Sequence, residues 1–172
     1  ATKPEAPTTI GNNVMMMVSS HLGHDGRIGN NVVLVNGSVL AGHSVVADNV
    51  TISGLCAVHQ FTRVGRMAFM SGGSVVSNDV PPFCIAWGRN RIVGINLVGL
   101  RRSGVPREHI TRVREAYRRA LATPVMRSEM VRILHELGRD CPPVAEMARF
   151  VEEAKRPVCV GRWPDAGDEH PA

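Results

Sequence analysis

The chain has 172 residues and a formal net charge of +5; 44% of its residues are hydrophobic, but only 4% are aromatic. This length suits one domain, or one domain with an appendage. The scarcity of aromatic side chains argues against a thick core and against a surface that stacks nucleic-acid bases. No apolar run is long enough to cross a membrane, no signal-peptide pattern occurs and no cysteine pair has CxxC spacing. We therefore expect a cytoplasmic protein with reduced thiols, no membrane span and no nucleic-acid partner.

The first element along the chain is a repeat of six residues. Every sixth position is aliphatic or methionine, and Gly, Asn, Asp and Ser, which turn the chain easily, recur between these positions. A period of six fits neither a helix nor a flat strand, and it predicts a parallel β-helix of hexapeptide repeats. The positions are Ile10, Met16, Leu22, Ile28, Leu34, Leu40, Val46, Ile52, Val58, Val64, Met70 and Val76.

Three hexads form one triangular coil, so residue n is expected beneath residue n+18. Residues 10–80 then supply about four coils, preceded by an N-terminal extension over residues 1–9. Pro81 and Pro82 cannot donate hydrogen bonds to a ladder. They are therefore expected to end the repeat and to begin a connecting loop over residues 81–104.

Residues 105–158 carry three amphipathic patterns that predict a helical C-terminal domain. The first follows Pro106, the second is expected to end at Gly138, and the third follows Pro142 and Pro143. Residues 159–172 are expected to be a frayed tail. The apolar faces consist of Ile110, Val113, Tyr117, Ala120 and Leu121, then Met130, Ile133, Leu134 and Leu137, then Val144, Met147, Phe150, Val151 and Ala154.

Basic residues gather between Arg101 and Arg119, at the start of the helical region. Arginine binds phosphates and carboxylates well because its guanidinium offers several donors in a fixed plane. This stretch therefore indicates an anionic partner. Besides nucleic acid, the candidates are a nucleotide diphosphate, a phosphopantetheine thioester and an acidic carrier protein.

Histidines cluster within the repeat. In the 18-residue register His24 lies beneath Gly42, and Asp25 lies beneath His43. Gly23 lies beneath Ala41, and small residues leave room beside the imidazoles. The predicted patch on one side of the prism consists of His24, Asp25, His43, His59 and Gln60, with His21 nearby.

This patch has three interpretations. Its members are ordinary polar residues on turns, or they bind a metal as in hexapeptide-repeat carbonic anhydrases, where histidines of adjacent subunits hold zinc. Alternatively, they perform acid–base catalysis, for which imidazole is well suited, and Asp25 can fix the tautomer of His24. Gly42 can then offer an unobstructed backbone N–H to a developing oxyanion.

Four segments carry a resemblance to a known family: "HLGHDGRIGNNVVLVNGSVLAGH", "AVHQFTRVG", "DVPPF" and "GINLVGLRRSG". In order and spacing they resemble the UDP-N-acetylglucosamine O-acyltransferases that open lipid A biosynthesis. The resemblance runs from about Ile10 to the end of the helical tail. It implies a left-handed β-helix, a homotrimer with sites between subunits, and no metal or other cofactor.

The resemblance also implies a role for the residues that match. His24 corresponds to the general base that deprotonates the 3-hydroxyl of UDP-N-acetylglucosamine, which then attacks the thioester of a 3-hydroxyacyl chain on acyl carrier protein. Asp25 would orient His24, and the N–H of Gly42 would face the thioester oxygen.

Other matches concern substrate binding. Asn96 and Arg102 match residues that reach the UDP-sugar from the neighbouring subunit, and Gly72 lies where the acyl groove measures chain length. The positions that match or adjoin further substrate contacts are His21, His43, His59 and Gln60.

Two departures from the family pattern stand out. The family's N-terminal coils, which contact the sugar, have no counterpart here, so the chain is either the C-terminal part of a larger enzyme or a shortened homologue. A carboxylate of the family's N-x-E-G-L motif is replaced by Val98. A non-catalytic truncated homologue and a zinc enzyme like the carbonic anhydrases therefore remain alternatives to the acyltransferase.

Overall fold

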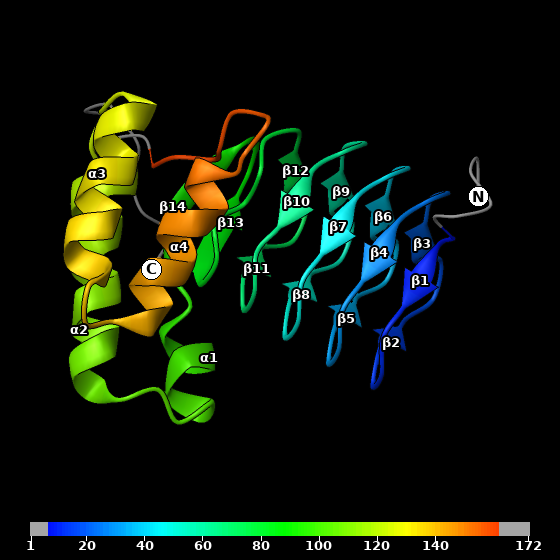
Figure 1. The fold of residues 1–172 in the computed structure, drawn as a ribbon. Helices are drawn as coiled ribbons and strands as arrows, with labels where there is room; N and C mark the ends of the chain where they lie inside the picture. The colour runs from blue at the N-terminus through cyan, green and yellow to red at the C-terminus, as the bar shows by residue number, and fades with distance from the viewer. Residues whose placement is uncertain (1–6, 162–172) are drawn as a thin grey trace, which may run out of the picture.

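The computed structural model describes residues 7–161 as a three-sided solenoid followed by a small helical region (Figure 1). Twelve two-residue strands make up the regular part of the solenoid. They are β1 (Thr9–Ile10), β2 (Met15–Met16), β3 (His21–Leu22), β4 (Arg27–Ile28), β5 (Val33–Leu34), β6 (Val39–Leu40), β7 (Val45–Val46), β8 (Thr51–Ile52), β9 (Ala57–Val58), β10 (Arg63–Val64), β11 (Phe69–Met70) and β12 (Val75–Val76).

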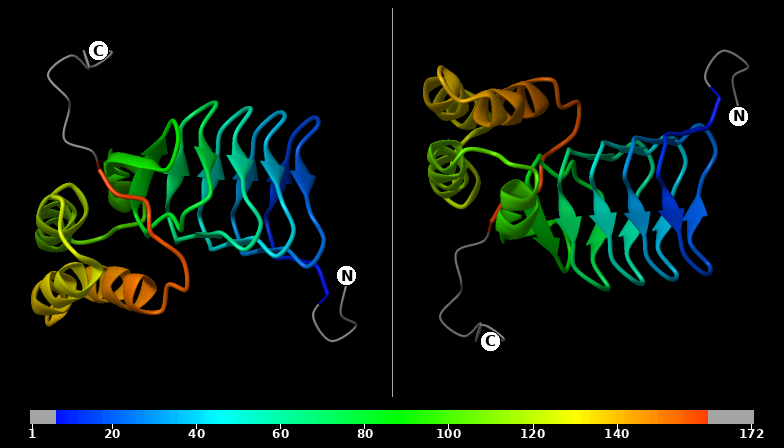
Figure 2. Two further views of the ribbon diagram at one scale, coloured as in Figure 1. Left: turned by 90° about the horizontal axis from the view of Figure 1, so that it is seen from above. Right: turned by 90° about the horizontal axis from the view of Figure 1, so that it is seen from below.

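The strands stack into three parallel sheets, one for each side of the prism (Figure 2). One sheet has the order β1-β4-β7-β10, the second contains β2-β5-β8-β11, and the third has the order β3-β6-β9-β12. Thr9 pairs with Arg27 and Ile10 with Ile28, which is the 18-residue register expected from the sequence. The prediction of a parallel β-helix of hexapeptide repeats is confirmed.

The six-residue period follows from one inward position and one turn position per hexad. The second residue of each strand points inward, and from Ile28 to Val76 these side chains are at most 4% exposed. Each turn places one residue in the left-handed region, with φ between 54° and 71°. Asn, Asp and Gly adopt this conformation most easily, which explains their recurrence. The left-handed positions are Asn13, Ser19, Asp25, Asn31, Gly37, His43, Asn49, Leu55, Phe61, Met67 and Gly73.

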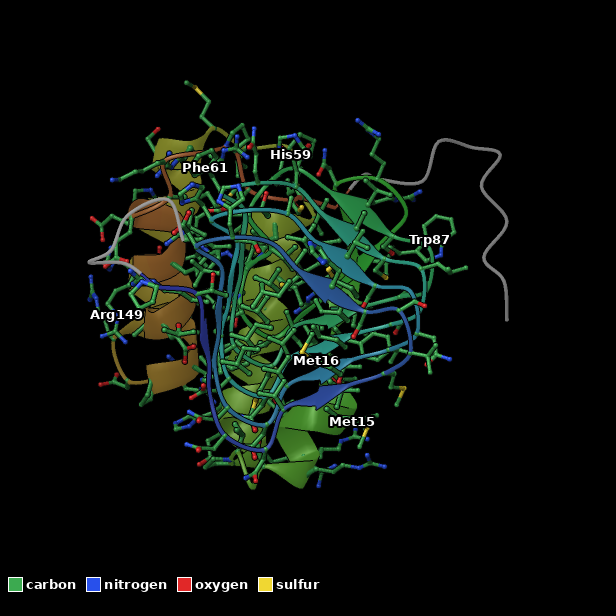
Figure 3. All side chains as sticks on the ribbon, turned by 90° about the vertical axis from the view of Figure 1, so that its right-hand side faces the viewer. Met15, Met16, His59, Phe61, Trp87 and Arg149 are labelled. Carbon is green, nitrogen blue, oxygen red and sulfur yellow. The ribbon has the colours of Figure 1, made fainter. Side chains whose placement is uncertain are left out.

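The first coil is the least covered part of the solenoid. Ile10 and Met16 occupy inward positions of the period, yet they are 50% and 42% exposed. Figure 3 looks at this end of the solenoid, where Met15 and Met16 lie on the nearest coil. The aliphatic ladder is therefore open at the side where a further coil would stack.

The expectation of a connecting loop over residues 81–104 is wrong. This segment forms β13 (Cys84–Trp87), β14 (Arg91–Ile95) and α1 (Leu97–Arg102). β13 lies parallel to β11, with Phe69 opposite Ile85, so this last coil is two residues shorter than the regular ones. Pro81 and Pro82 are buried at a corner, where no ladder donor is needed, and they do not stop the stacking. β14 then turns back antiparallel on β13 and becomes the edge of the sheet.

The helices beyond the solenoid are α2 (Arg107–Ala116), which continues as the single π-helical turn η1 (Tyr117–Leu121), α3 (Arg127–Gly138) and α4 (Pro142–Glu152). No helix in residues 7–161 is long and apolar enough to cross a membrane. Helix α3 ends at Gly138 as predicted, and a Cβ there would lie 2.9 Å from the backbone nitrogen of Ala145. The predicted apolar faces are largely buried, including Ile110, Val113, Ala120, Leu121, Met130, Ile133, Leu134, Leu137, Val144, Met147 and Val151.

Two arginines of the solenoid, Arg63 and Arg66, hold α4 against it. Arg63 on β10 contacts Asp79 at 2.7 Å and donates to the carbonyl of Phe150 at 2.8 Å. Arg66 contacts Glu146 of α4 at 2.8 Å. The chain after α4 then returns to the solenoid, since residues 158 and 160 form parallel bridges with residues 79 and 91. The start of the tail that was expected to fray is thus paired; residues 162–172 lie outside the described part.

The junction between the regular and the shortened coil can be tested at Gly65. A Cβ on this residue would lie 2.5 Å from the nitrogen and 2.7 Å from Cδ of Pro82. Because the proline ring cannot move aside, Gly65→Ala is expected to lower the free energy of unfolding by about 1–3 kcal/mol. Denaturant unfolding measures this change. Gly94→Ala is the control, because a Cβ there meets nothing within 4 Å; equal stability of the two variants would contradict the close packing.

Candidate active site

Most of the candidate residues lie along one edge of the prism, which we call the histidine edge. It consists of the turns at residues 23–26, 41–44 and 59–62, which connect the β3-β6-β9 face to the β4-β7-β10 face. His59 and Phe61 mark it in Figure 3, well away from Trp87 on another side of the solenoid. The 18-residue register of the strands thus brings His24, Asp25, Gly42, His43, His59 and Gln60 onto adjacent turns.

Asp25 is the centre of the histidine edge. Its side chain is only 3% exposed, and its Oδ2 lies 2.8 Å from Nδ1 of His24 and 3.6 Å from Nε2 of His43. The two imidazole rings meet edge to face, with centroids 5.1 Å apart. The backbone N–H of Asp25 donates to the hydroxyl of Thr8 at 2.8 Å. One buried carboxylate therefore faces two histidines from different coils.

The hydrogen bond between His24 and Asp25 defines the tautomer of His24. An ionised carboxylate only accepts, so Nδ1 of a neutral His24 must carry the proton. Nε2 is then left with its lone pair. The His24 side chain is 54% exposed, so this nitrogen belongs to a ring that solvent or a substrate can reach. The arrangement is that of a base held by a buried carboxylate.

Gly42 is needed for this geometry. A Cβ on Gly42 would lie 2.6 Å from Nε2 of His24, so any side chain would displace the imidazole. Gly23, one coil below Ala41, is equally constrained, because its Cβ would lie 2.6 Å from the nitrogen of Gly42. Neither glycine has a positive φ, so backbone conformation does not require them. The close packing of the coils does.

The other candidate residues of this edge are more exposed. His21 lies on β3, opposite Val39, and is exposed. His59 Nδ1 lies 3.3 Å from the carbonyl oxygen of Gln60, and that oxygen accepts a hydrogen bond from Arg156 at 2.8 Å. These side chains do not join the His24–Asp25–His43 cluster.

Gly72, Asn96 and Arg102 lie away from the histidine edge. Gly72 belongs to the turn between β11 and β12, on a second edge, where it borders an apolar groove with Gly54, Leu55 and Gly73. Asn96 precedes α1 and donates to the carbonyl of Met67, which is on the third edge, between β10 and β11. Arg102 is exposed at the end of α1. One chain thus distributes the candidate residues over all three edges.

Asn96 has a clear structural role. Its Oδ1 accepts a hydrogen bond from the N–H of Gly99 at 2.8 Å and thereby caps α1, while its Nδ2 donates to Met67 at 2.9 Å. A Cβ on Gly99 would lie 2.5 Å from Nδ2 of Asn96, so the glycine admits the cap. Val98, which replaces the carboxylate of the motif, is 56% exposed on the same helix.

Comparisons with known proteins agree with this architecture. A family model described as UDP N-acetylglucosamine O-acyltransferase, domain 2, matches residues 79–159. The acyl-(acyl-carrier-protein)–UDP-N-acetylglucosamine O-acyltransferase of Stenotrophomonas maltophilia is 41% identical over 155 residues, which cover 88% of this chain and 58% of that protein. The protein of the same name from Myxococcus xanthus is 44% identical over 151 residues, which cover 87% of this chain and 58% of that protein.

The solved structures agree as well. The crystal structure of Francisella novicida UDP-N-acetylglucosamine acyltransferase matches 94% of this chain and 62% of that chain, with a TM-score of 0.83 and 32% identity. Over most of its own length this chain is therefore similar to UDP-N-acetylglucosamine O-acyltransferases. The match also confirms the prediction of a left-handed β-helix with a helical C-terminal region. The chain spans less than two thirds of the length of these relatives.

Three contacts of this chain were not predicted from its sequence. Phe61 stacks on His43, with ring centroids 4.6 Å apart and an interplanar angle of 8°. Thr8 binds the backbone of Asp25, and Arg156 reaches Gln60 from beyond α4. The register that placed His43 above Asp25 also places Phe61 above His43, so the contact between Phe61 and His43 could have been predicted from the sequence. The contact of Arg156 could not, because no repeat relates this residue to the solenoid.

The cysteines take no part in the chemistry of this edge. All four are buried and free, and they lie in the core. Burial raises the pKa of Cys159 to about 12 and raises the pKa of Cys84 above its usual range. Thiols with such pKa values stay protonated at neutral pH and are poor nucleophiles and metal ligands.

Metal binding is the remaining alternative for the His24–Asp25–His43 cluster. One ligand atom from each residue lies within 4.8 Å of the others, a donor set that suits zinc. A tetrahedral zinc with bonds of about 2.0–2.2 Å holds neighbouring ligand atoms roughly 3.3 Å apart. The 2.8 Å between His24 and Asp25 is shorter than this and matches a shared proton. The geometry therefore favours the hydrogen-bonded pair over a metal site.

Metal analysis separates the two interpretations. Purified protein is expected to contain far less than one zinc per chain, and prolonged chelation is expected to leave its Tm unchanged, because the cluster is held by hydrogen bonds. Elemental analysis and thermal unfolding with and without chelator provide the measurements. Zinc bound at one ion per chain and lost in His43→Ala would show instead that the cluster is a metal centre.

Proposed function

We propose that this chain carries the catalytic residues of an acyltransferase. The enzyme moves a 3-hydroxyacyl chain from acyl carrier protein to the 3-hydroxyl of UDP-N-acetylglucosamine. This reaction is the first step of lipid A biosynthesis and takes place in the cytoplasm. The relatives named above are acyl-carrier-protein-dependent enzymes acting on this nucleotide sugar. The observation that carries the proposal is the hydrogen bond between the exposed imidazole of His24 and the buried carboxylate of Asp25.

His24 acts as the general base. Its Nε2 accepts the proton of the sugar 3-hydroxyl while that oxygen attacks the thioester carbonyl carbon. Asp25 stabilises the imidazolium that forms, because its Oδ2 lies 2.8 Å from the protonated Nδ1. When the tetrahedral intermediate collapses, the C–S bond breaks and the proton on Nε2 passes to the departing thiolate of the carrier. The ester and a free carrier thiol are the products, and His24 is neutral again.

Gly42 supplies the oxyanion donor. Its backbone N–H makes no hydrogen bond within residues 7–161, although Ala41 and His43 on either side of it both donate to neighbouring coils. The Cα of Gly42 faces Nε2 of His24, since a Cβ on this residue would lie 2.6 Å from that nitrogen, and the reacting carbonyl would sit beside it. A backbone N–H that is already aimed at a developing negative charge stabilises it without reorganisation.

A trimer would complete the site. Asn96 and Arg102 lie on a different edge from His24, so they can serve the same substrate only from a neighbouring subunit. Cyclic symmetry brings one edge of each protomer against another edge of the next. In this arrangement Arg102 binds the nucleotide phosphates, Asn96 positions the turn that presents it, and the arginines between Arg101 and Arg119 attract the acidic carrier. The apolar groove beside Gly72 receives the acyl chain.

The alternative is a non-catalytic homologue. It is favoured by Val98, which replaces the carboxylate of the family motif and is 56% exposed on α1. The intact constellation of His24, Asp25 and Gly42 argues against it, because a structural solenoid needs neither the close approach of His24 to Gly42 nor a buried carboxylate.

Removing the base tests the mechanism. His24→Ala is expected to lower kcat of acyl transfer by roughly 10²–10⁴-fold with little change in Tm, since general-base catalysis contributes about that much and the side chain is half exposed. The assay uses acyl carrier protein charged with a 3-hydroxyacyl chain. His135→Ala, an exposed histidine on α3, is the control. Near-normal turnover by His24→Ala would refute the base, and an inactive unmodified protein would support the non-catalytic alternative.

Mixed trimers test the shared site. Co-expression of His24→Ala and Arg102→Ala chains is expected to restore activity that neither variant has alone, in roughly a quarter of the sites of a random mixture. His24→Ala mixed with Asp25→Asn is the control, because both residues lie on one edge and no chain then carries both. Equal activity of the two mixtures would show that the site is not shared between subunits.

A further inference from the structure

Phe61 has a backbone conformation that is unfavourable for its residue type. Its φ is 63°, in the left-handed region, where a bulky side chain is an outlier. Met67 and Phe83 adopt the same conformation, but both are buried, and burial offsets their strain. Phe61 is 51% exposed, so its strain is not offset in this way. Leu55 is left-handed and exposed as well, with a φ of 58° and an exposed fraction of 76%, so the contacts of the ring are what distinguish Phe61.

The ring of Phe61 supports the histidine edge. Asp25, His43 and Phe61 occupy the same left-handed position in three successive coils, with φ values of 56°, 58° and 63°. The Phe61 ring lies flat on His43, with a centroid distance of 4.6 Å. His43 in turn meets the ring of His24 edge to face at 5.1 Å and turns its Nε2 toward Asp25. Each ring thus restricts the rotation of the ring below it.

Arg156 closes this column from outside. Its guanidinium lies 5.9 Å from the centre of the Phe61 ring and donates to the carbonyl of Gln60 at 2.8 Å and to that of Ser77 at 3.3 Å. A guanidinium over an aromatic face is attractive. The segment after α4 therefore holds the turn that carries Phe61.

We propose that Phe61 is a positioning residue for acyl transfer: its ring fixes the plane of His43, which holds the His24 imidazole in the orientation that keeps Nδ1 on Asp25 and leaves Nε2 for the sugar hydroxyl. The inference rests on the proposed function of His24. It predicts that His24 carries its proton on Nδ1, which faces Asp25 Oδ2 at 2.8 Å. Nε2 of His43 lies 3.6 Å from the same oxygen, beyond hydrogen-bond distance, so His43 acts through its ring contact with His24.

The chain offers matched variants for a test. Phe61→Asn removes the ring but suits the backbone, since Asn13, Asn31 and Asn49 adopt the same conformation in other turns. Phe61→Tyr keeps a flat ring. Trp87→Ala is the control: Trp87 is 46% exposed and has Arg91 at 5.6 Å from the centre of its ring, but it lies on β13, on another side of the solenoid (Figure 3).

The direct measurement is the ¹⁵N chemical shift of each imidazole nitrogen, taken on the whole protein at a pH where both rings are neutral. Phe61→Asn is expected to keep or raise Tm, because it relieves the backbone strain. At the same time the His43 ring loses its single orientation, and the Nδ1–H fraction of His24 falls. In the active enzyme kcat is expected to fall about 10- to 100-fold, as for a small misplacement of a reacting group. Phe61→Tyr should restore all three properties, and Trp87→Ala should change none of them.

The proposal would be overturned if Phe61→Asn kept the tautomers and the ring mobility of the wild-type histidines. An equal loss of histidine order in Trp87→Ala would overturn it as well. A Phe61→Asn protein that changes only its oligomeric mass would do the same, because Phe61 would then be a packing residue between subunits. The chemical shifts do not depend on turnover. An inactive wild-type protein with the predicted tautomer of His24 would therefore refute the acyl-transfer function and leave the positioning role of Phe61 supported.

Discussion

The stacking of each coil on the next, in an 18-residue register, is the constraint on which the rest of the structure depends. Backbone hydrogen bonds join adjacent coils, for example from the N–H of His43 to the carbonyl of His24. The inner aliphatic ladder stabilises this stacking whatever residues occupy the turns. The turns are therefore free to carry chemistry. Residues far apart in the chain are brought into contact without any long loop, as Asp25 and His43 are.

The same register explains how much was predictable. The inward position of each strand followed from the period alone, whereas the second buried position of each hexad, occupied for example by Val32, Val50 and Cys56, was not predicted. The neighbours of His24 and Asp25 on the next coil followed from adding 18 to their residue numbers. The orientation of the imidazoles did not, since Nδ1 of His24 faces Asp25 through a side-chain rotation that no period encodes.

The failures have physical causes too. Pro81 and Pro82 suggested the end of the stack because proline cannot donate to a ladder, but at a corner no donor is needed. Asn96 is a different case: its match to a substrate contact stays a prediction, and the structure adds a role in which its Oδ1 caps α1 and its Nδ2 donates to Met67. The signal was present, since an asparagine three residues before Gly99 at the start of a helix is a common cap.

The distribution of polar residues over the three edges links the fold to its chemistry. A triangular solenoid keeps its edges apart, so residues on different edges of one chain cannot meet. The turn between β3 and β4 holds His24 and Asp25, while Asn96 and Arg102 belong to another edge. In the proposed trimer, chemistry that needs both groups would occur between protomers. The rigid coil would then fix the spacing along the edge that a neighbouring protomer contacts.

Asp25 shows why this edge needs more than two residues. Its carboxylate is buried and accepts from His24, and the same oxygen faces His43. A His43 ring that turned freely could bring its Nε2 to this oxygen and compete with His24. Ordering the second ring is therefore part of orienting the first. In a solenoid the natural place for the restraining group is one coil further on, at the same turn position. That position is occupied by Phe61, whose left-handed backbone would suit asparagine or glycine better.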